Sequence, residues 1–164
     1  MTARPATLRR PRIAVAPASP RSDEAGALLR AGDAAMRALY PPEECYLLSA
    51  EQLDRDDTVF FVARVDGTAA GCAAMVDRGD YAEVKRMFVD PDARGLGLGH
   101  LLMDAVERTA RDRGLARIRL ETGHLLASAH ALYRARGFIE RPVFGGYPDL
   151  PGSLFMEKPL TGGA

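Results

Sequence analysis

Apolar residues cluster along the middle of the chain in short runs that are separated by polar turn residues. Three runs with this pattern are rich in β-branched and aromatic residues, and they span residues 58–65, 68–76 and 81–89. Asp66-Gly67 separates the first two runs and is a strong hairpin signal, and Gly79 stands in the second turn. The pattern predicts an antiparallel meander of three strands.

Other stretches repeat their apolar residues at the three- to four-residue spacing of an amphipathic helix. Four helices are expected, and they begin near Ser22, Ser49, Leu98 and Ala127. The first is capped by Ser22 and ends before Pro41-Pro42. Ser49 forms a capping box with Gln52, which opens a short second helix.

Shorter apolar runs predict the remaining strands, at residues 12–18, 115–122, 138–144 and 153–160. The predicted order is β-α-α-β-β-β-α-β-α-β-β, in which a meander leads into a strand–helix–strand crossover. This order indicates an α/β fold whose mixed, mostly antiparallel central sheet carries helices on both faces. No repeat or linker divides the chain, so residues 11–164 are expected to form one domain after a flexible tail at 1–10.

Charge and composition narrow the classes of partner. The formal net charge of the 164 residues is zero, which gives no overall attraction to nucleic acid or to an anionic membrane. No apolar run is long enough to cross a bilayer, and the N-terminus lacks a signal-peptide core. The two cysteines have neither disulfide-type nor metal-site spacing, so we expect reduced thiols and a cytoplasmic protein.

Three alternating glycines stand where the clearest helix begins, in the stretch VDPDARGLGLGHLLMDAVE of residues 89–107. The register excludes a dinucleotide fingerprint, because a G-x-G-x-x-G pattern begun at Gly95 or Gly97 does not end in glycine. No Gly-x-x-x-x-Gly-Lys sequence is present, which excludes an NTPase P-loop. Two interpretations are left: an ordinary flexible turn, or an anion-binding helix start.

The anion-binding interpretation explains more of the pattern. The first N–H groups of a helix have no internal partner, and the helix dipole places partial positive charge there. Missing side chains let a pyrophosphate approach these N–H groups, and Arg94 adds a charged donor beside them. This accounts for glycines that cost about 1 kcal/mol each in a helix interior.

Two motifs resemble those of the GNAT N-acetyltransferases. The first is Arg-x-x-Gly-x-Gly from Arg94 to Gly99, which follows the strand end MFVDP. The second is ALYRARGF, residues 131–138, which is similar to the family's Leu-Tyr-x-x-x-Gly-Phe helix end. By element order the resemblance covers about residues 12–160, and the later stretches are similar to a subgroup of small bacterial GNAT proteins.

The resemblance implies a GNAT fold in which acetyl-CoA binds between two splayed parallel strands. It assigns cofactor binding to Met87, Phe88, Val89, Arg94, Gly95, Leu96, Gly97, Leu98, Gly99 and His100. The family often has Asn or Gln at the position of Leu126, and Ser128 is a candidate substitute. The implied activity is direct acetyl transfer to a primary amine of a small molecule, without a metal. The alternative is a catalytically weak acetyl-CoA sensor of the same fold.

The resemblance also suggests which residues transfer protons. Tyr133 occupies the position of the family's general acid, although it could simply pack on the buried face of its helix. Glu83 is one candidate base, acting through a water, and the alternative is a structural ion pair with Lys85 or Arg86. Glu121, at the end of the next strand, is the rival base or amine-binding carboxylate.

Regular alternation in residues 82–89 would place Glu83, Lys85 and Met87 on one face of the strand and the residues between them on the other. Phe144 and Tyr147, in the segment before the last strand, are candidate walls of the substrate site or else cover the edge of the core. The three histidines have no metal-site spacing. Homodimers are frequent in the family, so a homodimer is a further expectation.

Overall fold

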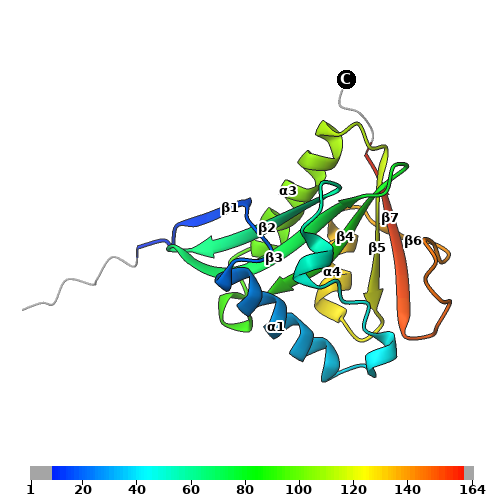
Figure 1. The fold of residues 1–164 in the computed structure, drawn as a ribbon, viewed down its shortest axis with the longest axis horizontal. Coiled ribbons are helices and arrows are strands. Elements are labelled where there is room, and N and C mark those ends of the chain that lie inside the picture. The colour runs from blue at the N-terminus through cyan, green and yellow to red at the C-terminus, as the bar shows by residue number, and fades with distance from the viewer. Residues whose placement is uncertain (1–8, 161–164) are drawn as a thin grey trace, which may run out of the picture.

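The computed structural model describes residues 9–160, and its centre is a seven-stranded sheet with the order β1-β2-β3-β4-β5-β7-β6. Figure 1 shows the strands fanned out across the view, with helices in front of the sheet and behind it. The strands are β1 (Ile13–Pro17), β2 (Thr58–Val65), β3 (Thr68–Asp77), β4 (Ala82–Val89), β5 (Arg117–Gly123), β6 (Ile139–Glu140) and β7 (Ser153–Pro159). All neighbours pair antiparallel except β4 and β5. The predicted mixed, mostly antiparallel sheet is confirmed.

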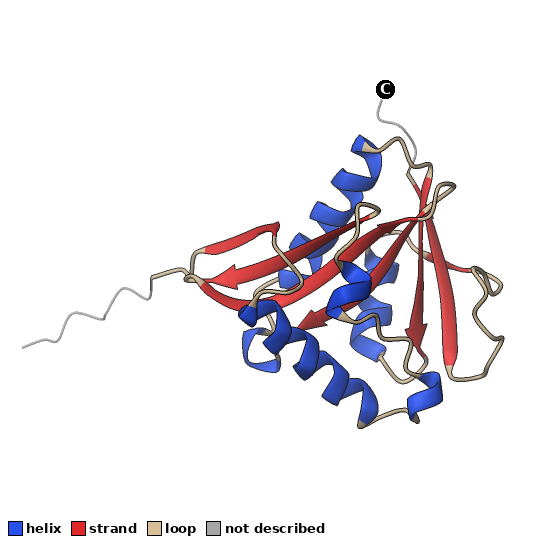
Figure 2. Ribbon diagram, in the orientation of Figure 1, coloured by secondary structure: helices blue, strands red, loops and turns tan. Residues whose placement is uncertain are grey.

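The helices cover the sheet from both sides, as predicted (Figure 2). They are α1 (Asp23–Arg37), α2 (Ala50–Leu53), α3 (Leu98–Asp112) and α4 (Ala127–Ala135), with 3-10 turns η1 (Pro42–Glu44) and η2 (Pro91–Ala93). Both hydrogen bonds of the predicted capping box open α2: Ser49 N–H donates to Gln52 Oε1, and Gln52 N–H donates to Ser49 Oγ. No helix in residues 9–160 combines the length and the apolar character that a membrane crossing requires.

Alternation along the central strands divides the core into two layers. Phe61 and Ala63 of β2 pack with α3 and α4, whereas Phe60 and Val62 of the same strand pack with α1 and α2. The sheet therefore has an α1 face and an α3 face, and both are buried near its middle.

A β-bulge interrupts β4. Arg86 and Met87 stand opposite the single β3 residue Ala73, and Arg86 has a φ of 58°. As a result Met87 packs on the α3 face and Phe88 on the α1 face, and the Arg86 guanidinium lies 2.5 Å from Asp33 of α1. The expected regular alternation is therefore wrong beyond Lys85, because one extra residue restarts the pattern.

The parallel pairing of β4 with β5 ends just before this bulge. Only residues 82–84 of β4 pair with residues 118–120 of β5. Beyond them the two strands diverge, and Figure 1 shows the widening gap between their arrowheads. A bulge bends a strand and increases its twist, which explains where the pairing ends. The predicted splayed parallel pair is confirmed.

The C-terminal hairpin differs from the expected one. The strand predicted at residues 138–144 is reduced to Ile139–Glu140, and β7 follows only after the irregular segment 141–152. Pro142 cannot donate a ladder hydrogen bond, and Gly145 and Gly146 have φ of 63° and 79°. Of the expected tail, residues 1–8 lie outside the described residues.

Candidate active site

The helix that follows the glycines begins with free donors. Gly97 is the N-cap residue of α3, has a φ of 77°, and provides no side-chain cap. Within residues 9–160, the backbone N–H groups of residues 95–100 donate no hydrogen bond. A Cβ on Gly95 or Gly97 would meet no atom within 4 Å, so the space outside the loop is open. These features fit an anion-binding helix start, and the left-handed φ explains both glycines.

The third glycine has a different role. A Cβ on Gly99 would lie 3.0 Å from Leu132 Cδ2 of α4, so its absence lets the two helices pack closely. Arg94 and His100 are exposed on either side of the loop. Gly99 therefore fixes the position of α4, which carries Tyr133.

Tyr133 lies inside the α3-face core with only 4% of its surface exposed, and its ring packs against Phe138 at 5.6 Å. Burial raises the pKa of Tyr133, and the negative charge of Glu121 raises it further. The phenol is therefore fully protonated at neutral pH, as a proton donor must be. Its packing and the predicted acid role are compatible.

Glu83 is almost completely buried, and both of its carboxylate oxygens are engaged. Arg78 Nε donates to Oε2 at 2.8 Å, and the Tyr147 hydroxyl donates to Oε1. Neither of the alternative ion-pair partners contacts Glu83, because Lys85 donates to Tyr147 and Arg86 turns toward Asp33 of α1 at the bulge. Arg78 and Tyr147 hold the Glu83 carboxylate instead, and its role as a base stays a prediction.

Glu121 has a different environment. It lies on β5 one residue beyond the last pair with β4 and is partly exposed. Burial raises the pKa of Glu121, an effect that Ser153 and Lys85 only partly offset, and the charge of Glu83 adds to the increase. A carboxylate with a raised pKa is a stronger base at neutral pH.

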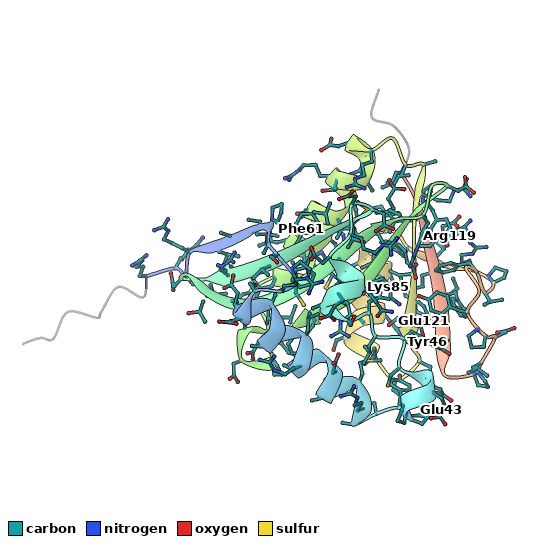
Figure 3. All side chains as sticks on the ribbon, viewed as in Figure 1. Glu43, Tyr46, Phe61, Lys85, Arg119 and Glu121 are labelled. Carbon is teal, nitrogen blue, oxygen red and sulfur yellow. The ribbon has the colours of Figure 1, made fainter. Side chains whose placement is uncertain are left out.

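Aromatic rings cover the α1 face beside these carboxylates. The Tyr147 ring lies 5.2 Å from that of Tyr46 and 5.5 Å from that of Phe144. Phe144 is only 6% exposed, so it packs beneath the surface, whereas Tyr147 is partly exposed. Figure 3 shows Tyr46, Lys85 and Glu121 on the same side of the sheet, from three different segments.

Comparison with known proteins decides the family. The sequence model of the acetyltransferase (GNAT) family matches residues 28–138, which include the glycine loop and Tyr133. The chain belongs to the GNAT family.

Relatives extend this GNAT assignment over most of the chain. An IAA acetyltransferase of Azospirillum brasilense is 45% identical over 152 residues, which are 92% of this chain and 99% of the relative. A crystal structure from Klebsiella pneumoniae, assigned to the acyl-CoA N-acyltransferases, is 35% identical, with a TM-score of 0.76 and coverage of 90% and 97%. The PaiA N-acetyltransferase of Thermoplasma acidophilum, solved with coenzyme A, has a TM-score of 0.71 at 20% identity and shows the fold alone. The protein is an N-acetyltransferase that uses acetyl-CoA.

In this GNAT enzyme, the segment between α1 and α2 lies over the end of β5 and is hydrogen-bonded to the residues that follow this strand. The Tyr40 hydroxyl accepts the Leu125 N–H at 2.7 Å and lies so close to Gly123 that a side chain there would collide with it. Tyr46 of the same segment stands against Tyr147. Sequence reasoning missed both tyrosines, and the only available signal was aromatic residues in a stretch without a predicted long element.

Two other features of the GNAT site bear on cofactor binding. Ser128 is exposed in the first turn of α4, and Leu126 is the N-cap residue of that helix without a side-chain cap. The first turn of α4 therefore offers a hydroxyl near the position where the family often has an amide. The assignment of Ser128 to the cofactor stays a prediction.

Proposed function

We propose that this GNAT enzyme transfers the acetyl group of acetyl-CoA directly to a primary amine of a small molecule, with Glu121 as the base and Tyr133 as the acid. The supporting observation is that Glu121 lies one residue beyond the last pair of β4 with β5, whereas both oxygens of Glu83 accept hydrogen bonds from Arg78 and Tyr147. Glu121 is close enough to Tyr133 for its charge to affect the phenol.

The residues present are suited to the cofactor. Bound acetyl-CoA supplies an acetyl group activated as a thioester. The free N–H groups of residues 95–100 and the exposed Arg94 would hold its pyrophosphate. Backbone groups of residues 87–89, which have no pairing with β5, would hydrogen-bond its pantetheine arm and the acetyl carbonyl.

Two side chains would carry out the proton transfers. An ammonium cannot attack a carbonyl, so the acceptor would first lose one proton to Glu121, which passes it to solvent. As the nitrogen forms the new bond to the acetyl carbon, it would lose a second proton to Glu121, which again releases it to solvent. As the carbon–sulfur bond breaks, its electron pair stays on sulfur, and the phenol of Tyr133 would donate a proton there. The tyrosine then regains its proton from solvent.

Glu121→Gln is expected to lower kcat/KM at pH 7 by about 10²-fold or more, because general bases contribute at least that factor. The raised pKa of Glu121 places the acidic limb of the wild-type profile above the ordinary glutamate value of 4.5. The measurement is the rate of release of free CoA thiol as a function of pH between about pH 5 and about pH 9, a range that includes the expected acidic limb. Glu83→Gln is the matched variant, and its pH profile should retain the acidic limb of the wild type. A normal profile in Glu121→Gln would assign the base elsewhere.

The same substitution is expected to stabilise the folded protein at neutral pH. A folded-state pKa above the unfolded value means that ionisation of Glu121 disfavours folding. This penalty is absent below the unfolded pKa and develops as the pH rises above it. Thermal unfolding should therefore show a higher Tm for Glu121→Gln at pH 7 and equal Tm values below about pH 4. A lower Tm at pH 7 would contradict the direction of the pKa shift.

A further inference from the structure

Lys85 is a buried amine with few acceptors. It is 7% exposed, and its Nζ donates one hydrogen bond, to the Tyr147 hydroxyl at 2.7 Å. Within residues 9–160 no carboxylate oxygen lies within 4 Å of Nζ. An ammonium has three N–H donors, and burial without an anionic partner is costly. Lys85 is therefore short of acceptors in the ligand-free protein.

A second donor near Lys85 is also unused. The Tyr46 hydroxyl is buried and makes no well-formed hydrogen bond in the described part of the chain, and the Ser153 side chain is the polar group beside it. Its ring and Lys85 Nζ both contact Tyr147, whose own proton is committed to Glu83. Two unsatisfied donors therefore flank one fixed tyrosine on the α1 face.

Four arginines of the strands and of the segments between them have anionic partners. Arg78 binds Glu83, Arg86 binds Asp33, and both Arg119 and Arg141 bind Glu157. Lys85 differs from these arginines because its only hydrogen-bond partner within residues 9–160 is the neutral hydroxyl of Tyr147.

Glu121 completes the arrangement from the neighbouring strand. Its charge acts on Lys85 and on Tyr46, yet no Lys or Arg nitrogen of residues 9–160 lies within 4 Å of its carboxylate. Unlike Glu83, which is paired with Arg78, Glu121 is thus a carboxylate without a Lys or Arg partner among the described residues, and it is separated from the two donors. Figure 3 shows all three residues on the same side of the sheet.

We infer that the acceptor carries a carboxylate beside its amine, as an α-amino acid does, and that Lys85 and Tyr46 bind this carboxylate while Glu121 receives the amine. The inference rests on the proposed function. The amino and carboxylate groups of an amino acid share one carbon, so they can face Glu121 and the donor pair together. Because the Tyr46 hydroxyl is enclosed, the segment that carries it has to move for the ligand to enter.

The test is a comparison of matched acceptors. Each proteinogenic amino acid is assayed beside its carboxamide and its decarboxylated amine, with acetyl-CoA saturating and CoA thiol release as the measurement. We expect at least one amino acid to exceed its carboxamide in kcat/KM by about ten- to hundredfold, the range for a hydrogen bond to a charged group. The carboxamide has the less basic amine and the larger unprotonated fraction, so basicity cannot produce this preference.

Two variants connect the preference to the site. Lys85→Met keeps the length of the side chain without its charge, and Tyr46→Phe removes only a hydroxyl that makes no well-formed hydrogen bond among residues 9–160. Each should reduce the acid-to-carboxamide ratio of kcat/KM to near one. Tyr46→Phe should also leave the Tm unchanged or higher, so it remains informative if Lys85→Met does not fold.

The outcomes separate the two hypotheses. If carboxamides and plain amines are acetylated as well as acids, or if the ratio is unchanged in both variants, the carboxylate inference is wrong and the proposed function stands. An equal loss for all acceptors in Lys85→Met would instead make Lys85 a base and overturn the inference. If acetyl-CoA binds but no acceptor of any series releases CoA, both are overturned.

Discussion

Tyr133→Phe is expected to lower kcat by about 10²- to 10⁴-fold while the Kd for acetyl-CoA stays unchanged, because the substitution removes only the proton that the departing sulfur needs. The ring of Tyr133 packs in the core, and phenylalanine preserves that packing. The Tm should therefore stay close to that of the wild type. Steady-state thiol release gives kcat, and isothermal titration with acetyl-CoA gives Kd.

Tyr81→Phe is the control for this measurement. This substitution also removes one hydroxyl, but the Tyr81 ring packs against Phe144 on the α1 face, whereas Tyr133 lies on the α3 face. Its kcat should equal that of the wild type. If Tyr133→Phe also retains full turnover, Tyr133 serves only to pack α4, and the acid must be water or another group.

Gly97→Val is expected to abolish the stabilisation of the protein by acetyl-CoA. In the wild type, a cofactor concentration 100 times Kd should raise the free energy of unfolding by about 2.7 kcal/mol. The valine side chain would project into the open space beside Gly97, where the pyrophosphate is expected. Thermal unfolding with and without acetyl-CoA measures the difference.

Backbone strain needs its own control, since valine at a φ of 77° costs about 1–2 kcal/mol without any effect on a ligand. Gly114, at the other end of α3, has a φ of 73°, and a Cβ there also meets nothing within 4 Å. Gly114→Val should therefore lower the Tm by a similar amount and keep the full shift with acetyl-CoA. If Gly97→Val also keeps the shift, the pyrophosphate binds elsewhere.

Local signals predicted most of the fold. The Asp66-Gly67 hairpin, the Ser49 capping box and the helical spacing after Leu98 each depend on residues close together in the chain, and the structure contains all three. The bulge was not predicted, because no glycine marks the residue with positive φ, and the adjacent charges of Lys85 and Arg86 do not by themselves indicate an extra residue. The reduction of the sixth strand to Ile139–Glu140 depended on Pro142, whose effect the apolar pattern concealed.

The candidate site was predictable only where a motif carries it. The Arg-x-x-Gly-x-Gly and ALYRARGF motifs are sufficient to identify the glycine loop and Tyr133. The sequence could not predict the contacts that distinguish Glu83 from Glu121, because they include Tyr147, which lies 64 residues from Glu83 in the chain. Tyr46 and the unsatisfied Lys85 emerge only when the loop before α2 is folded onto the sheet.

Arg86 is a surplus residue in its strand. A chain without it would join Lys85 directly to Met87, and every later side chain of β4 would keep its present layer. Such a deletion would keep the later side chains in their layers but would remove the buried ion pair between Arg86 and Asp33 of α1, and we expect it to lengthen the pairing of β4 with β5. The extra residue therefore limits the parallel ladder and separates the two strands where we propose that the substrates bind.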